Sequence, residues 1–498
     1  MPGATTWNEL LMRHWLGSAQ PAVMTVDDVW TGDELVRRAA GAAEWLAAMG
    51  FEPGTGVPAL IEGSATAVAL VTGGALSRRP VAPLGTRLRP AELAAATRNL
   101  SSAGLVTTPG LIDLANEVAA LAGTQVCLLD APPPEAAIPD GHADPDDLVV
   151  IVHTSGTTGA PKPVLMHQRE MVERVGIYEA TMPIGPGHRY CSASPFHHTA
   201  AVTMVFTVLG LGAGLIPQAG FSIEGWRTAG RLGVTHALLV PTMIDLLLEA
   251  GALADAQPLV LQYGAAPMDP GTLVEALAVL PDVEFLQIFG QTEVSPITAL
   301  TPSDHRLGLS SRPDILATVG RAVPGVELRV EHPDAEGIGE LALRAPHAFV
   351  HDGDGWRRTG DLGRVDCDGY VSLQGRVHDR IVRGGENIYP LEVERALATC
   401  PGVRDVAVVG VPDRRWGEIV KAFVVPTHSA APPTLDQLQR HGGALLARFK
   451  LPTKLEIVDE LPRNANGKLL RHQLVGRGPW TVPTRGGESV LDLPKETK

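Results

Sequence analysis

Residues 152–166, VHTSGTTGAPKPVLM, combine hydroxyl groups, glycines and one lysine in a loop that follows an apolar strand. Glycines let backbone N–H groups approach an anion closely, while hydroxyls and a cation add donors and charge. This composition predicts a phosphate clamp, and a plain Ser/Thr turn is the alternative. It is not a Walker A loop, because Lys162 is followed by Pro163 instead of Ser or Thr. The expected contacts are Thr154, Ser155, Gly156, Thr157, Thr158, Gly159 and Lys162.

Further chemical groups follow later in the chain. Residues 287–293 read QIFGQTE, a strand that ends in an aromatic residue, a glycine and a carboxylate. Residues 357–362 read RRTGDL, and residues 375–390 read GRVHDRIVRGGENIYP. Lys468 stands in a glycine-flanked turn of LPRNANGKLLRHQL. A lone lysine in such a turn is ordinarily solvated, so its chemical importance depends on the other segments.

These segments occur together and in order: TSGTTGAPK, FGQTE, TGDL, a GR-containing hinge and NGK. The pattern resembles the adenylate-forming superfamily, which comprises acyl- and aryl-CoA ligases, luciferases and peptide-synthetase adenylation domains. Its motifs are most similar to AMP-forming acyl- and aryl-CoA ligases such as the 4-chlorobenzoate–CoA ligases. The resemblance covers residues 5–475 and identifies the superfamily more specifically than the substrate. It implies ATP, Mg²⁺ and coenzyme A as the small molecules bound besides the acid.

The resemblance also implies roles for single residues at the nucleotide. The 154–162 loop would grip the β- and γ-phosphates, and Glu293 with Thr158 would hold Mg²⁺, which favours oxygen ligands. Phe289 would stack on adenine in place of the more common Tyr. The remaining expected contacts are Thr292 with the α-phosphate, Asp361 with the ribose hydroxyls, and Arg376 with the nucleotide near the domain boundary.

Lys468 matches the family lysine that bridges the acid carboxylate and the α-phosphate. A point cation stabilises the transition state in which these two anions approach each other. The catalytic set expected from the resemblance is therefore Lys468, Glu293, Thr292 and His197. Two positions depart from the family pattern: Pro163 replaces a usual Gly, and His378 stands at the hinge where Asp or Lys is usual. A hinge histidine predicts pH-sensitive switching, because imidazole titrates near pH ~6.5; the alternative is a surface hinge that tolerates many polar residues.

The segment SPFHHTAAV resembles the aromatic-His segment that lines the acyl pocket of CoA ligases. Domains that activate amino acids carry an Asp after this Phe, whereas this chain has His197, which disfavours an α-amino acid. The alternative for the paired histidines is a packed core turn. Tyr263 is expected to shorten the pocket and to favour a compact aromatic or short branched acid over a long-chain acid. The expected pocket lining is His197, His198, Thr199, Leu238, Tyr263, Gly264, Ile288, Gly290 and Ser295.

Coenzyme A is the expected acceptor. Trp416 resembles the tryptophan that aryl-CoA ligases bring to the thioester-forming conformation, and ARFKLPTK places cations around Phe449. A local basic patch suits the three phosphates of CoA, although a solvated helix end is the alternative. A carrier-protein thiol, an amine or another nucleophile is a second hypothesis for the acceptor, and a non-catalytic sensor that keeps the fold is a third. The sequence leaves a homodimer open.

Composition limits the other classes of function. The chain has 498 residues, and its 41 Lys plus Arg against 55 Asp plus Glu give a net charge of −14. A chain this acidic lacks the overall positive potential that would attract nucleic acid or an anionic membrane. Four separated cysteines and a start without a signal-like pattern predict a cytoplasmic protein. The apolar stretch 200–216 is short for a membrane span and contains glycines, which predicts a buried helix.

The order of the segments predicts an α/β fold. Apolar strands alternate with helical patterns over the first 330 residues, which is typical of stacked, mostly parallel sheets covered by helices. Shorter β-type segments near 320–377 predict a small barrel-like subdomain. We expect an adenylation domain over residues 1–377, a small mobile α+β domain over 378–475 with its hinge near His378, and a tail over 476–498.

Overall fold

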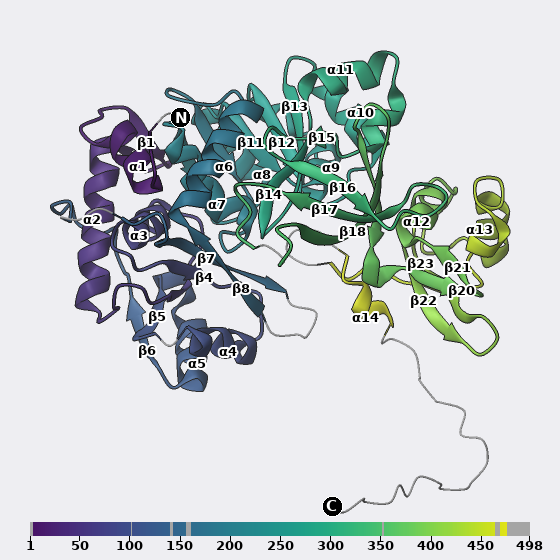
Figure 1. The fold of residues 1–498 in the computed structure, drawn as a ribbon, viewed down its shortest axis with the longest axis horizontal. Helices are drawn as coiled ribbons and strands as arrows, with labels where there is room; N and C mark the ends of the chain where they lie inside the picture. Colours follow the sequence, from purple (N-terminus) through teal and green to yellow (C-terminus); the bar gives the residue numbers. More distant parts are fainter. Residues whose placement is uncertain are drawn as a thin grey trace, which may run out of the picture. The chain divides into compact units, whose positions relative to one another are not determined.

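The computed structural model describes residues 3–100, 102–139, 143–155, 161–350, 353–463 and 469–475. The chain divides into two compact units, and the boundary between them falls after His378. Figure 1 shows the order of the elements along the chain. The expected mixed α/β organisation, a large sheet-rich unit followed by a smaller one, is confirmed.

In the described residues, the first sheet of the larger unit has six strands in the order β6-β5-β3-β4-β7-β8. All neighbours are parallel except β7 and β8, which form an antiparallel pair. Parallel strands need crossover connections, and helices supply them here. The strands are β3 (Val57–Leu60), β4 (Val81–Pro83), β5 (Gly104–Thr107), β6 (Gln125–Leu128), β7 (Leu148–Ser155) and β8 (Pro161–His167).

The second sheet has nine strands among the described residues, in the order β15-β14-β13-β12-β11-β9-β10-β1-β2. Its central strands are parallel, and antiparallel strands close both edges. The strands are β1 (Pro21–Met24), β2 (Val29–Thr31), β9 (Arg189–Ser192), β10 (Gly214–Pro217), β11 (His236–Leu239), β12 (Val260–Gly264), β13 (Glu284–Gln291), β14 (Val294–Leu300) and β15 (Arg321–Ala322).

Helices cover both sheets, and several of them begin after a Ser, Thr or Asp whose side chain caps the first turn. At α2, Thr31 and Glu34 form a reciprocal capping box: the Glu34 carboxylate accepts from the Thr31 N–H at 2.7 Å. The helices of this unit are α1 (Trp7–Trp15), α2 (Gly32–Ala48), α3 (Ala65–Leu76), α4 (Pro90–Asn99), α5 (Ile112–Ala122), α6 (Gln168–Thr181), α7 (Thr199–Gly210), α8 (Ile223–Arg231), α9 (Pro241–Glu249), α10 (Pro270–Val279) and α11 (Pro302–Ser310).

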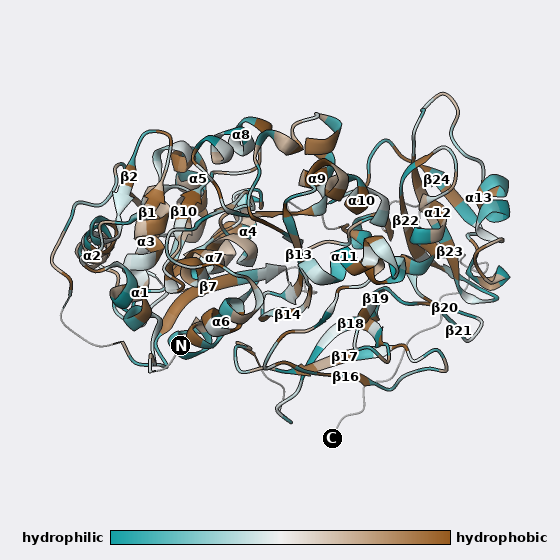
Figure 2. Cartoon of the chain, turned by 90° about the horizontal axis from the view of Figure 1, so that it is seen from above, coloured by the Kyte–Doolittle hydropathy of each residue, from teal (hydrophilic) through white to brown (hydrophobic). Residues whose placement is uncertain are grey.

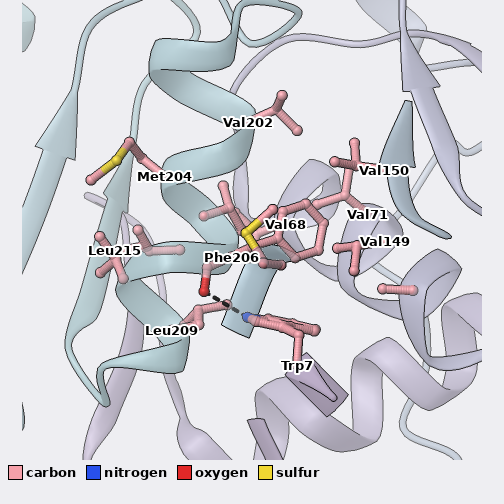
Figure 3. Close-up of a cluster of buried hydrophobic side chains, with 14 of the residues drawn as sticks. Trp7, Val68, Val71, Val149, Val150, Val202, Met204, Phe206, Leu209 and Leu215 are labelled. Carbon is pink, nitrogen blue, oxygen red and sulfur yellow. Dashed lines mark hydrogen bonds between the residues drawn. The ribbon is translucent and has the colours of Figure 1, made fainter. Parts of the chain in front are cut away.

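The main hydrophobic core joins the two large sheets through α1, α3, α6 and α7. Figure 3 shows its centre, where Trp7 packs with Val68, Val71 and Phe206. The indole N–H of Trp7 donates to the Phe206 carbonyl at 2.6 Å, so a buried polar atom of a large aromatic residue has its partner. A second core cluster lies on the opposite face of the nine-stranded sheet, among α8, α9 and α10.

The apolar stretch 200–216 forms most of α7 and then β10, and α7 is buried on nearly every side. The prediction of a buried helix is therefore confirmed for its larger part. In the described residues no helix combines the length and apolarity that crossing a bilayer requires. In Figure 2 the buried strand β7 has the hydrophobic colour, and α13 (Leu435–Gly442) is mainly in the hydrophilic colour.

The segment expected to form a barrel-like subdomain is an open antiparallel sheet. Four strands follow one another in the order β16-β17-β18-β19, and within the described residues the edge strands β16 and β19 do not pair. The connections are hairpins, so each strand pairs with its neighbour in the sequence. The strands are β16 (Glu327–Glu331), β17 (Gly339–Arg344), β18 (Arg357–Val365) and β19 (Val371–Arg376).

The smaller unit is built around the long hairpin of β22 (Val403–Asp413) and β23 (Gly417–Pro426). Its core packs α12 (Pro390–Ala398) and α13 against this hairpin. The Arg471 guanidinium of α14 (Arg471–Val475) donates to the buried Glu394 carboxylate at 2.5 Å and 2.6 Å. The remaining strands of this sheet in the described chain are β20 (Ile381–Arg383), β21 (Glu386–Ile388) and β24 (Lys454–Ile457).

Candidate active site

The two ends of the expected phosphate loop lie side by side. Strands β7 and β8 are antiparallel, and their register places Thr154 opposite Lys162. The Thr154 hydroxyl donates to the Lys162 carbonyl at 3.4 Å, and the Lys162 side chain is exposed. Pro163 pairs with His153 within the hairpin, so the proline belongs to a strand. Gly156, Thr157, Thr158, Gly159 and the side chain of Ser155 lie outside the described residues.

Thr292 and Glu293 form the turn between β13 and β14. The register pairs Gln291 with Val294, and the ladder shifts between Phe289 and Gln291. A Cβ atom on Gly290 would lie 2.6 Å from the Ser295 hydroxyl, so the turn needs a glycine at this position. This geometry presents Thr292 and Glu293 at the end of a parallel strand, where open α/β sheets usually bind ligands.

Glu293 forms an ion pair with Arg357 of β18, with 3.1 Å between Oε1 and Nη2. The side chains are 24% and 14% exposed, so both charges are largely removed from water. The backbone carbonyl of Glu293 accepts from the Phe349 N–H at 2.9 Å. Two segments that are far apart in the sequence, QTE and RRTGDL, therefore meet at this carboxylate.

A second set of contacts joins the QTE and RRTGDL segments. The Gln291 side-chain amide donates to the Asp361 carboxylate at 2.6 Å and to the Thr359 carbonyl at 2.7 Å. Asp361 is buried, and its other oxygen pairs with Arg376 Nε at 2.6 Å across the β18–β19 ladder. The structure thus brings together Asp361 and Arg376, two residues that were each expected to contact the nucleotide. Gln291 was not predicted, although it lies inside the FGQTE motif.

Phe289, expected to stack on adenine, packs in part against the cluster that contains Val294 and Leu343. Its ring therefore has an apolar surface on one side within the protein. Stacking on a base would use a ring face that this cluster does not cover.

The nine-stranded sheet separates the expected pocket residues onto two faces. In neighbouring parallel strands, residues that are register partners point to the same face of the sheet. Leu238 is the partner of Gln262, and Gly264 is the partner of Ile288, so these four residues share one face. Tyr263 is the neighbour of both Gln262 and Gly264 along β12, so its side chain points to the opposite face. On the pocket face, the Tyr190 hydroxyl donates to the Gln262 side-chain oxygen at 3.3 Å. Neither residue was predicted from the sequence.

The expectation that Tyr263 shortens the acyl pocket is wrong for this structure. Its ring is 1% exposed, belongs to the core cluster among α8, α9 and α10, and packs edge-on against Phe285. Its hydroxyl bonds His305 Nε2 at 2.8 Å, and His305 Nδ1 bonds the Thr301 carbonyl at 2.8 Å. A one-residue difference along a strand reverses the direction of the side chain, and the motif alone does not show which face is which.

His197 and His198 lie at the start of α7, where His198 is the N-cap residue. Their rings are 4.1 Å apart, centroid to centroid. Burial, with a smaller effect of the Arg87 charge, lowers the pKa of His197 to about 4. Burial, with the charges of His197 and Arg87, lowers the pKa of His198 to about 3. Both imidazoles are therefore neutral at pH 7 and offer hydrogen bonds without charge.

Unpartnered polar atoms collect around this turn. In the described part of the chain, His198 Nε2, the Thr199 hydroxyl and the Ser194 hydroxyl are buried without a hydrogen-bond partner. Buried polar atoms usually have partners, so such a group is a place where a polar ligand would gain hydrogen bonds. A cavity of about 30 Å³ adjoins the turn; its lining includes Tyr190, Ser192, Ser194, Phe196, Met204 and Leu215.

The expected acceptor residues lie in the smaller unit. Trp416 is 42% exposed, and the guanidinium carbons of Arg415 and Arg383 lie 5.0 Å and 5.9 Å from its ring centre. Lys450 pairs with the Glu392 carboxylate at 2.7 Å, so its charge is compensated within the unit. Lys468 lies outside the described residues.

Two family models match most of the chain. The family model described as AMP-binding enzyme matches residues 17–350, and the model for the C-terminal domain of AMP-binding enzymes matches residues 392–468. The fatty acid–[acyl-carrier-protein] ligase ScoC of Streptomyces coeruleorubidus is 32% identical, over 92% of this chain and 93% of that protein. A sulfoacetate–CoA ligase of Cupriavidus necator is 31% identical, over 74% of this chain and 72% of that protein.

Among solved structures, the amide bond synthetase McbA of Marinactinospora thermotolerans has a TM-score of 0.82 and 27% identity. The match covers 94% of this chain and 98% of that one. The names of these three proteins state different acceptors for the activated acid. The comparison therefore bears on the adenylating half of the chemistry and leaves the acceptor as a separate question.

Proposed function

This chain belongs to the AMP-binding enzyme family, the adenylate-forming ligases, and from that premise we propose that it joins a carboxylic acid to coenzyme A. In the first half-reaction the acid carboxylate attacks the α-phosphorus of ATP, the bond to the β-phosphate breaks, and pyrophosphate leaves. In the second, the CoA sulfur attacks the acyl carbonyl, and AMP leaves with the bonding electrons while the thiol proton passes to solvent. The products are an acyl-CoA thioester and AMP.

The residues of the chain would position the reactants in the first half-reaction. Asp361, held by Gln291 and Arg376, would receive the ribose hydroxyls. Thr292 would donate to the α-phosphate from the turn after β13, and the exposed Lys162 would meet the outer phosphates. Lys468 would bring the acid carboxylate to the α-phosphate, which is the approach of like charges that a fixed cation stabilises.

Glu293 fits a magnesium site of the kind in which nucleotide oxygens and water supply most ligands. The described residues contain no group of three or more His, Cys, Asp or Glu side chains that could hold an ion without a nucleotide. Glu293, with Thr158, would hold the ion. When bound there, Mg²⁺ would neutralise the negative charge that develops on the phosphates.

The observation that supports CoA as the acceptor is the exposed Trp416 with two guanidinium groups near its ring. An adenine ring can stack on an exposed indole, and guanidinium groups suit phosphates. Transfer to a carrier-protein thiol or to an amine is the second candidate. The relatives ScoC and McbA favour it, because their names state an acyl-carrier-protein ligase and an amide bond synthetase.

The test is pyrophosphate release from Mg·ATP with a panel of free acids, each with and without CoA, and mass spectrometry of the products. The panel contains benzoates, cinnamates, short and branched aliphatic acids, fatty acids and amino acids. Turnover that increases with CoA and yields a thioester supports the proposal. An acyl-adenylate that accumulates with no effect of CoA favours the second candidate, which carrier proteins and amines then test directly.

A further inference from the structure

Arg174 of α6 is a charged side chain in the interior of the larger unit, and it is 1% exposed. Its Nε donates to the Thr207 hydroxyl at 3.0 Å, and its Nη1 donates to the Ser295 carbonyl. Its Nη2 lies 3.6 Å from the Met204 sulfur, and the guanidinium carbon lies 4.8 Å from the ring centre of Tyr178. In the described part of the chain, Arg174 forms no ion pair with a carboxylate.

A buried guanidinium without a counter-charge is costly. Neutral acceptors compensate only part of the lost hydration of an ion, and buried arginines are therefore normally paired with carboxylates. The guanidinium also has five N–H groups that need acceptors, and the Met204 thioether sulfur beside one of them is only a weak acceptor. Burial lowers the pKa of Arg174, which reflects the same cost.

The neighbouring imidazole of His347 does not carry part of the charge. His347 is fully buried, and its Nε2 bonds the Pro296 carbonyl at 2.8 Å. Burial, together with the charge of Arg174, lowers the pKa of His347 to about 4, so this imidazole is neutral at pH 7. The charge in this part of the core is that of Arg174.

The location of Arg174 connects it with the acid pocket. Ser295, which accepts its hydrogen bond, follows the QTE turn by two residues and faces Gly290. Met204 contacts the guanidinium and also lines the cavity next to the SPFHHT turn. Figure 3 shows Met204 on α7 with its side chain directed away from Val149 and Val150. Met204 therefore contacts both the cavity and the buried cation, and methionine readily adopts other rotamers.

We propose that the acid activated by this enzyme carries a second anionic group, a carboxylate or a sulfonate, and that Arg174 binds it. This inference rests on the proposed adenylation of a carboxylic acid. The reacting carboxylate lies at the nucleotide, and the distal anion reaches the guanidinium when Met204 moves aside. The bound acid then supplies the counter-charge that the protein lacks, and a neutral acid of the same length leaves the cation unpaired.

The first experiment compares matched acids in the adenylation step alone. Succinate, glutarate and adipate are measured against their monomethyl esters and against butyrate, valerate and caproate, and short sulfonated acids distinguish a sulfonate from a carboxylate. We expect kcat/KM for pyrophosphate release to be at least about 30-fold higher for the anionic member of the best pair, as for other buried charge pairs. Equal or better use of the neutral acids overturns the inference.

The second experiment separates binding of the anion from a structural role. In Arg174→Met the preference for the anionic acid should fall at least about 10-fold, and Arg174→Lys should retain part of it. Arg169→Met removes an exposed arginine from the same helix and should leave the preference unchanged. An equal loss for anionic and neutral acids would show that Arg174 serves only to tie α6 to α7 and β14, and the inference would fail.

The two proposals fail in different ways. Because pyrophosphate release is measured without CoA, a failure of transfer to CoA contradicts only the proposed acceptor. Activation of neutral acids alone contradicts only the role of Arg174. If Arg174→Met does not fold, the comparison of matched acids on the unmodified enzyme still decides the question. No release with any acid of either set contradicts both.

Discussion

Arg357 pairs with Glu293 across the junction of β18 and the β13–β14 turn, with 3.1 Å between guanidinium and carboxylate. In the described residues, Arg357 Nε is buried without a hydrogen-bond partner, so the guanidinium is not saturated by the protein. The carboxylate expected to hold Mg²⁺ is therefore compensated by a cation of the chain itself. Binding of Mg·ATP would exchange this partner for the metal ion.

Replacing Glu293 with Gln should reduce pyrophosphate release at least about 100-fold, because the ligand loses its charge and the ion's electrostatic contribution is weakened. The dependence on Mg²⁺ concentration should shift to higher values at the same time. Steady-state kinetics over a Mg²⁺ titration measures both effects. Glu331→Gln, which removes a carboxylate from the ion pairs of the four-stranded sheet, is the matched control. Normal Mg²⁺ dependence in Glu293→Gln would contradict the role of Glu293.

Lys468→Ala should lower adenylate formation by orders of magnitude and leave thioester formation from a supplied acyl-adenylate largely intact. Trp416→Ala should have the reverse effect, because Trp416 is expected to act only when CoA is present. Single-turnover assays of the two half-reactions measure both variants. Lys421→Ala, which removes a lysine that pairs with Glu456 in the smaller unit, serves as the control. Equal losses in both half-reactions for Lys468→Ala would be inconsistent with a role in the first step alone.

Asp361→Asn should weaken ATP binding about 10- to 100-fold, the usual effect of losing a hydrogen bond to a charged group. The buried carboxylate accepts from Gln291 and pairs with Arg376, so the change also disturbs both neighbours. Calorimetric titration with ATP gives the affinity, and Asp282→Asn, on an exposed loop, is the control. Unchanged ATP affinity would exclude Asp361 from the nucleotide site.

Tyr263→Phe should lower the free energy of unfolding by about 1–3 kcal/mol, because His305 Nε2 loses its buried partner. The preference among acids should not change, since Tyr263 lies on the face of the sheet away from Ile288. Ile288→Ala, on the pocket face, should change that preference. Denaturant unfolding and the acid panel test the two statements. A changed preference in Tyr263→Phe would return this residue to the pocket.

Stability should decline as the pH falls from 6.5 to about 4. Burial is the main cause that lowers the pKa values of His236, His305 and His347 to about 4 from 6.5. In this interval the unfolded chain binds protons that the folded chain does not, so acidification favours unfolding. Above pH 6.5 these histidines are neutral in both states and their contribution is constant.

Unfolding free energies measured between pH 7.5 and 4.5 test this expectation. His236→Gln should flatten the decline, because one buried imidazole no longer takes up a proton on unfolding. His428→Gln, at an exposed position, should leave the slope as it is. Identical slopes in all three proteins would mean that other groups dominate the pH dependence.

The sequence by itself determined the adenylating chemistry and the alternation of strands and helices. The motifs TSGTTGAPK, FGQTE and TGDL are local strings, and runs such as LVVIVHTSG and VEFLQIFG form the strands β7 and β13 as predicted. Hydrophobic period and turn residues act within a few positions along the chain, so they can be recognised without the fold.

Only the tertiary structure decided which face each residue occupies and which distant residues meet. The direction of Tyr263 follows from the register of β12 against β11 and β13, and register is a property of the assembled sheet. The contacts of Gln291 with Asp361, and of Arg357 with Glu293, join segments about 65 to 70 residues apart. The burial of Arg174 without a carboxylate depends on α6, α7 and β14 together. Such relationships arise because side-chain packing couples elements that the local sequence specifies separately.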